Sequence, residues 1–226
     1  SNAQKKSVPG GIDMLELIHR YQGARFNSSG IALEDIAYLT YTSGTTGSPK
    51  GAMNTHGNIA FNARVYQAMQ RLDDTDVILG VAPLFHVTGE VAHLAAAALA
   101  GIPVVLYYRF DPAETLRLIE RWKVTTTVAS ITVYIALMNH PDIAKRNLAS
   151  FTKAYSGGAP VSEAVVNQFE KLTGQYLYNV YGMTETNSPS HIVPLGKRAP
   201  VDPESGALSV GVPVPGCIMK IMDLEE

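Results

Sequence analysis

The chain has 226 residues, of which 46% are hydrophobic, enough for one substantial core. Its formal net charge of −2 gives no general attraction to nucleic acid or to an anionic membrane, so we expect neither partner. One cysteine, Cys217, excludes an internal disulfide and a zinc site built on several cysteines, and it suits a reducing, cytoplasmic compartment. The longest apolar run, residues 91–100, is too short to span a bilayer, and no signal peptide is visible.

The first thirty residues contain little that predicts a core. Residues 1–3 look like the scar of a cleaved expression tag, so they are set aside. Residues 4–30 predict one short helix, capped by Asp13, and then a linker.

Strand and helix signals alternate from about residue 31 to residue 186. Strands are predicted at 36–41, 77–81, 104–108, 124–129, 153–156 and 176–181, the first of them buried. Helices are predicted at about 55–70, 90–100, 112–122, 133–139 and 163–173, with Thr55, Asp111 and Ser162 as caps. This alternation predicts an α/β domain: a largely parallel β-sheet with helices on both faces.

The composition changes to Pro, Gly, Ser and charged residues after Thr186. We therefore expect the α/β unit to end there and residues 187–226 to form a loop and the start of a β segment, with a strand at 217–222. Because the chain stops directly after that strand, we expect the β segment to be truncated.

Four unusual loops follow predicted strands, at residues 42–51, 82–89, 157–160 and 182–185. In parallel sheets, ligands bind outside the carboxyl ends of the strands. We therefore expect the four loops to lie on one rim and to form one site.

The first loop has the composition of a phosphate-binding cradle. Glycines allow backbone N–H groups to approach an anion, hydroxyls add donors, and Lys50 adds a positive charge. It is not a Walker A loop, because Gly47 is followed by Ser48 and Pro49 rather than by Lys. A solvated turn is the plain alternative. The residues predicted to bind phosphate are Thr42, Ser43, Gly44, Thr45, Thr46, Gly47 and Lys50.

The other three loops each have a plain alternative too. His86 stands between apolar residues, where a lone histidine is usually a core residue. Gly157 to Pro160 alone would be an ordinary turn between a strand and a helix. Glu185 follows a strand at the expected rim, where a carboxylate suits a magnesium ion that bridges phosphates, although a solvated or helix-capping glutamate fits as well.

Taken together, these segments resemble the adenylate-forming (AMP-binding) superfamily. The resemblance rests on four segments: the loop Tyr41–Gly51, the Pro-Leu-Phe-His segment ending at His86, Gly157–Pro160, and Tyr-Gly-Met-Thr-Glu at residues 181–185. The last form is common in acyl-CoA synthetases, including long-chain fatty-acid–CoA ligases. The resemblance covers nearly the whole chain, which matches only the middle of such an enzyme.

The resemblance implies roles for individual residues. Gly158, Ala159 and Pro160 contact adenine, on which Tyr181 stacks, with Gly182 and Met183 beside it. Thr184 reaches the α-phosphate, and Glu185 binds Mg²⁺. His86, Val87 and Thr132 line the acyl pocket. We expect Lys50, His86, Thr184 and Glu185 to serve catalysis.

The implied reaction uses ATP and Mg²⁺ to convert a carboxylic acid into an acyl-adenylate and pyrophosphate. Coenzyme A, the co-substrate, then displaces AMP and forms a thioester. His86 favours a fatty or aryl acid over an amino acid, because peptide-synthetase domains usually carry an aspartate there to hold the amino group.

Two alternatives stay open: an amino-acid adenylation domain of a peptide synthetase, and a non-catalytic nucleotide-binding module. A P-loop kinase is disfavoured by the context of the lysine. The family's Tyr-x-Thr-Gly-Asp segment and its mobile C-terminal domain have no counterpart in these residues. We therefore expect the isolated chain to be inactive, and its exposed edges to produce homo-oligomers.

Overall fold

The computed structural model describes residues 11–25, 30–42 and 47–223. By its internal contacts the chain divides into two units, residues 1–32 and residues 33–226. The first contains one helix, α1 (Met14–Arg20), whose N-terminus is capped as predicted: the Asp13 side chain accepts from the Leu15 N–H at 2.8 Å. None of the α1 residues is buried.

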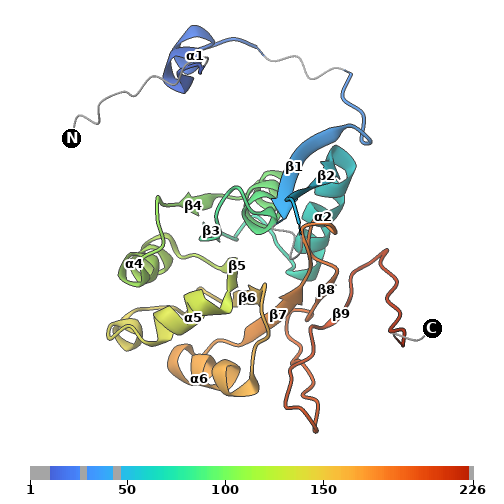
Figure 1. Cartoon of the computed structure of the whole chain (residues 1–226). Helices are drawn as coiled ribbons and strands as arrows, with labels where there is room; N and C mark the ends of the chain where they lie inside the picture. Colours follow the sequence, from blue (N-terminus) through green and yellow to red (C-terminus); the bar gives the residue numbers. More distant parts are fainter. Residues whose placement is uncertain (1–10, 26–29, 43–46, 224–226) are drawn as a thin grey trace. The chain divides into compact units, whose positions relative to one another are not determined.

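The second unit is built on a seven-stranded sheet in the order β4-β3-β5-β6-β7-β8-β9 (Figure 1). Its first five members are parallel, and β8 and β9 are antiparallel additions at one edge. The strands are β3 (Ile78–Gly80), β4 (Val104–Leu106), β5 (Thr126–Ser130), β6 (Lys153–Gly157), β7 (Leu177–Tyr181), β8 (His191–Ile192) and β9 (Val212–Pro213). The predicted largely parallel α/β sheet is confirmed.

Helices cover both faces of this sheet, as predicted (Figure 1). They are α2 (His56–Met69), η1 (Thr88–Ala95), α3 (Ala96–Ala100), α4 (Pro112–Trp122), α5 (Ile131–Met138), η2 (Ile143–Lys145) and α6 (Glu163–Thr173). On one face α2, η1 and α3 pack in a core with Ile78 and Val128; on the other, α4, α5 and α6 pack with Leu79 and Ala129. Consecutive strand residues thus enter opposite cores, as the two-residue repeat of a strand requires.

Helix starts follow the capping signals in the sequence. Thr55 and Asn58 form a reciprocal capping box at the start of α2, and Asp111 caps α4 through the Glu114 N–H at 2.8 Å. Ser162 occupies the cap position of α6, but its side chain makes no capping hydrogen bond. The helix predicted near residues 90–100 begins earlier and differently, as the π-helix η1, which continues into α3.

The first strand does not belong to the sheet. β1 (Ile36–Thr42) pairs antiparallel with β2 (Lys50–Thr55) in a separate two-stranded hairpin. The prediction of a buried strand is wrong, because Ile36, Leu39 and Tyr41 are each more than half exposed. Apolar, β-branched sequence fits any pleated strand and does not tell a hairpin from a central strand.

The C-terminal stretch also differs from expectation. Instead of leaving the sheet after Thr186, the chain returns to it as β8 and β9. The strand predicted at Cys217–Met222 is wrong, since these residues form no strand and Ile218 and Ile221 are almost fully exposed. The division into domains at residue 186 stays a prediction.

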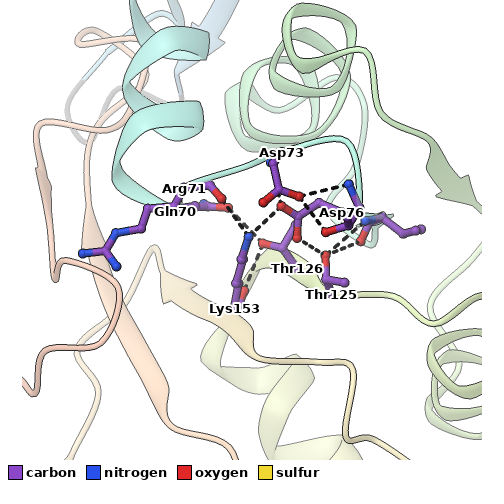
Figure 2. A network of polar contacts seen from close by, with 9 residues as sticks. Gln70, Arg71, Asp73, Asp76, Thr125, Thr126 and Lys153 are labelled. Atoms are coloured by element: carbon purple, nitrogen blue, oxygen red, sulfur yellow. Dashed lines mark hydrogen bonds and ion pairs between the residues drawn. The ribbon is translucent and has the colours of Figure 1, made fainter.

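A polar network fixes the amino ends of the strands (Figure 2). The Lys153 ammonium lies 2.6 Å from the Asp76 carboxylate and also donates to the Arg71 carbonyl at 2.9 Å. Asp76 accepts from the Thr125 hydroxyl at 2.5 Å. These contacts join the segments entering β3, β5 and β6 at the edge opposite the cleft described next.

Candidate active site

One large cleft, of about 1010 Å³, opens at the carboxyl ends of β3 to β7. In the sheet, β4 lies on one side of β3 and β5 lies on the other, so the order of the strands reverses at β3. Open α/β sheets bind ligands at such a reversal point. Three of the four predicted loops contribute to the wall: residues 82–88, 157–158 and 182–184.

The fourth loop lies on the β1–β2 hairpin, and none of its described residues lines the cleft. Thr42 and Lys50 are register partners at the end of this hairpin where β1 leads into residues 43–49, and the Thr42 hydroxyl donates to the Lys50 carbonyl at 3.4 Å. Lys50 and Gly47 are exposed. The predicted phosphate-binding residues Ser43, Gly44, Thr45 and Thr46 lie outside the described residues.

The loop after β3 presents His86 at the surface of the cleft. Its backbone N–H donates to the Pro83 carbonyl at 3.0 Å, and its ring Nδ1 accepts from the Thr88 N–H at 3.2 Å. Because Nδ1 is an acceptor, the neutral ring carries its proton on Nε2. An Nε2–H group suits a carboxylate acceptor, so the exposed ring fits the role that the sequence predicts.

The same loop depends on a close backbone approach at Gly89. A Cβ on this residue would lie 2.2 Å from the Pro83 carbonyl oxygen, closer than any side chain tolerates. Val87 is buried and lines the cleft beside His86. The loop therefore packs tightly on the first turn of η1, and π-helical turns such as this one are frequent at functional sites.

In the turn after β6, only some of the residues predicted to contact adenine line the cleft. Gly157 and Gly158 line it, whereas Ala159 and Pro160 are exposed and do not. Ser130, the register partner of Gly157 on β5, also lines the cleft, and its hydroxyl lies 2.7 Å from that of Thr132, which does not.

The turn after β7 carries the Tyr-Gly-Met-Thr-Glu segment. Gly182, Met183 and Thr184 line the cleft, whereas Tyr181 and Glu185 are exposed and lie outside its wall. Gly182 has no room for a Cβ, which would meet the Ser188 hydroxyl at 2.7 Å. The segment is thus folded closely back on residues 186–188.

Sequence reasoning missed the wall formed by the residues after β4. Tyr107, Tyr108, Arg109 and Phe110 all line the cleft. The sequence prediction extended that strand to residue 108, while the structure ends β4 at Leu106 and so turns the next four residues into a carboxyl-end loop. The strong helix start at Asp111 marked the far end of this loop and was the available signal. Tyr107 keeps its proton, because burial raises its pKa to about 12.

No metal cage exists among the described residues: no three His, Cys, Asp or Glu side chains gather closely enough to hold an ion. A magnesium ion that bridges phosphates needs only one or two protein carboxylates. The exposed carboxylate of Glu185, next to the cleft-lining Thr184, fits that requirement. No helix in residues 11–25, 30–42 and 47–223 is long and apolar enough to cross a membrane.

Fold and cleft together define a nucleotide-binding type of α/β protein, with its ligand loops at the carboxyl edge of a doubly covered sheet. A family model described as "AMP-binding enzyme" matches residues 5–226, and the chain belongs to this family. Its resemblance to the adenylate-forming enzymes is thereby confirmed.

Curated relatives include a "Long-chain-fatty-acid--CoA ligase" of Bacillus subtilis, 38% identical over 159 residues, covering 70% of this chain and 28% of the relative. A "Feruloyl-CoA synthase" of Amycolatopsis is 36% identical over 155 residues, covering 69% of this chain and 31% of the relative. The chain thus spans less than a third of the length of these two relatives.

Solved structures agree. The anthranilate CoA ligase AuaEII in complex with anthranoyl-AMP matches 98% of this chain and 42% of its own, with 25% identity and a TM-score of 0.85. O-succinylbenzoate coenzyme A synthetase of Bacillus subtilis, in complex with ATP and magnesium ion, matches 87% of this chain and 39% of its own, with 30% identity and a TM-score of 0.74.

Proposed function

We propose that the full-length protein in which this chain occurs is an AMP-forming acyl-CoA synthetase. The observation that carries the proposal is the gathering of His86, Gly158 and Thr184 around one cleft at the reversal point of the sheet. The names of the relatives, all of them CoA ligases or synthases, support it.

The reaction begins when a substrate carboxylate attacks the α-phosphorus of ATP and pyrophosphate leaves. The oxygen–phosphorus bond to the carboxylate forms as the bond to pyrophosphate breaks, which gives an acyl-adenylate. The thiol of coenzyme A then attacks the acyl carbon, and AMP leaves as the thioester forms. No protein nucleophile is needed, so the residues act through position and charge.

We assign the nucleotide to the Gly157–Gly158 and Gly182–Thr184 walls. Gly158, Ala159 and Pro160 would border adenine, Tyr181 would stack on it, and Thr184 would donate to the α-phosphate. The hairpin residues Thr42 to Lys50 would hold the outer phosphates. Glu185 would hold Mg²⁺, which supplies charge neutralisation at the phosphates when bound.

The acid is assigned to the part of the cleft between the loops after β3 and β4. His86 would donate from Nε2 to the substrate carboxylate, with Val87 behind it. Leu84, Phe85 and Phe110 line the same region and give it an apolar surface. This surface favours a fatty or aryl acid, and none of the described residues that line the cleft is an aspartate or glutamate that could hold an α-ammonium group.

The deciding experiment is a panel of carboxylic acids on the full-length protein. Fatty acids of increasing length, aryl acids and amino acids would be compared by pyrophosphate exchange and by AMP release with coenzyme A. AMP release that depends on both a fatty or aryl acid and coenzyme A supports the proposal. Exchange with amino acids alone would instead identify an amino-acid adenylation domain, and Mg·ATP binding without turnover of any acid would identify a nucleotide-binding module.

Two variants link that activity to this site. Lys50→Ala and Glu185→Gln should each lower adenylation by roughly 10²-fold, the loss expected for one electrostatic contact to a developing charge. Both side chains are exposed, so their removal leaves no cavity and folding should be kept. We further propose that the isolated 226 residues bind ATP weakly and form no thioester; acyl-CoA production by the purified chain would refute this.

A further inference from the structure

Three side chains from β1 and α2 form hydrogen bonds with residues 186–188, which directly follow Thr184 and Glu185. The Tyr38 hydroxyl of β1 donates to the Asn187 side-chain oxygen. From α2, the Asn62 amide donates to the Thr186 carbonyl at 3.0 Å, and the Tyr66 hydroxyl lies 3.1 Å from that of Ser188. Three consecutive residues, 186 to 188, therefore each have a partner on β1 or α2.

These partners contact a backbone turn with two left-handed positions. Asn187 and Ser188 have φ of +55° and +33°, in the left-handed region that side chains other than glycine rarely occupy. Asn187 is 1% exposed and Asn62 3% exposed, so their hydrogen bonds are not exchanged for water. The contacts thus select one conformation of the turn.

The Tyr38 contact differs from the other two because it comes from the hairpin. Tyr38 lies on β1 four residues before Thr42, and the strand register continues from it to the Thr42–Lys50 pair. Burial, and then the nearby Glu90 carboxylate, raise the pKa of Tyr38, so its hydroxyl keeps its proton and remains a donor. The hydrogen bond therefore connects β1, which leads into the proposed phosphate-binding loop, with the turn that carries Glu185, the proposed ligand of Mg²⁺.

We infer that Tyr38 is a positioning residue for adenylation. Through Asn187 it positions the Thr42–Lys50 end of the hairpin relative to the turn that carries Thr184 and Glu185. The inference rests on the proposed function, in which these two parts act on the same Mg·ATP. Loss of the hydroxyl should leave the residues that contact ATP present but incorrectly spaced.

The test is Tyr38→Phe in the full-length protein, which removes one oxygen and keeps the ring. We expect kcat/KM for Mg·ATP in pyrophosphate exchange to fall by about tenfold, less than the roughly 10²-fold that a 1 Å misplacement can cost. Kinetics would be measured well below the unfolding temperature, so that a loss of stability alone does not alter them. Wild-type kinetics in the folded variant would overturn the inference.

Tyr176→Phe is the matched control. Tyr176 is also partly buried and its hydroxyl also has one partner, the Ala199 N–H at 3.0 Å, but it precedes β7 at the amino end of the sheet. It should lose stability and keep its kinetics. An equal kinetic loss in Tyr176→Phe would overturn a specific role for Tyr38.

Asn187→Gly supplies the second arm, because glycine accepts the left-handed backbone and removes only the side chain. It should lower kcat/KM as Tyr38→Phe does, and the double variant should lose no more than either single one. Additive losses would overturn the inference. If Tyr38→Phe does not fold, Asn187→Gly alone decides, since wild-type kinetics there would also refute it.

Binding of Mg·ATP by calorimetry separates this inference from the proposed function. If the wild type binds Mg·ATP but activates no acid, the proposed function fails, and weaker binding by Tyr38→Phe alone still supports the positioning role. If the wild type binds no Mg·ATP, both fail.

Discussion

Replacing Lys153 with methionine should show how much the network at the amino ends of the strands contributes to stability (Figure 2). The side-chain ammonium is 13% exposed and lies 2.6 Å from the carboxylate of Asp76, which is 2% exposed. Methionine keeps most of the length and apolar volume of lysine, so the main loss is the charge and its donors.

The expected cost follows from the group left behind. Without Lys153, the Asp76 carboxylate keeps its bonds from the Thr125 hydroxyl and the Asp73 N–H but loses the ammonium group that pairs with it. Removing one member of a buried pair costs about 3–5 kcal/mol, and the partial exposure of Lys153 places the estimate at the lower end, about 3 kcal/mol. For a chain of this size that corresponds to a fall in Tm of roughly 6–12 °C.

Urea titration and thermal melts of the purified chain would measure this loss. Arg198→Met is the control, because Arg198 is exposed and its pair with the partly exposed Glu170 should contribute little to stability. Adding Asp76→Asn to Lys153→Met should recover part of the loss, since the unpaired charge is removed while an acceptor oxygen remains. A double variant no more stable than Lys153→Met would show that packing, and not the uncompensated carboxylate, causes the loss.

Three further outcomes are expected. His93 is fully buried, and burial lowers its pKa to about 4, so below pH 6.5 the unfolded chain takes up a proton that the folded chain does not. This difference should lower the free energy of unfolding by about 2 kcal/mol between pH 7 and pH 5. Urea titrations at the two pH values would measure it, and His93→Gln should remove this part of the difference. Gly89→Ala should destabilise the chain by about 1–3 kcal/mol in the same titration, because its Cβ would collide with the Pro83 carbonyl; an unchanged midpoint would refute that close approach. Hydrogen exchange should be about tenfold or more faster in β1 and β2 than in β5 and β6, and equal protection would contradict a weakly supported hairpin.

The sequence allowed the parallel sheet and its helices to be predicted because those signals are local. Asp111 before Pro112 determines where α4 begins, and the same capping chemistry appears in the structure. The rim of loops followed from a topological rule, and three of the four loops lie where the rule places them.

The errors concern features that only tertiary contacts determine. The strand at Ile36–Thr42 pairs with Lys50–Thr55 rather than with the sheet, and nothing in its apolar composition distinguishes these partners. The strands β8 and β9 are two residues each, too short for any periodic pattern. The π-helix η1 likewise has no composition signature, and the close approach of the Pro83 carbonyl to Gly89 in its first turn is a tertiary contact.

Because the hairpin is separate from the sheet, the Met183–Ser188 turn connects the two parts of the candidate site. The cleft walls belong to a sheet with a core on each face, whereas Thr42 and Lys50 belong to a hairpin in which Asn54 is the one buried residue of the two described strands. One link from the hairpin to the rest of the domain is the chain itself, which continues from β2 into α2. α2 then holds residues 186 and 188 of the turn. A second link is the Tyr38 hydroxyl, which holds residue 187. Both links end on the same three residues, so a turn with two left-handed positions and a buried amide fixes the hairpin side of the site relative to the sheet side.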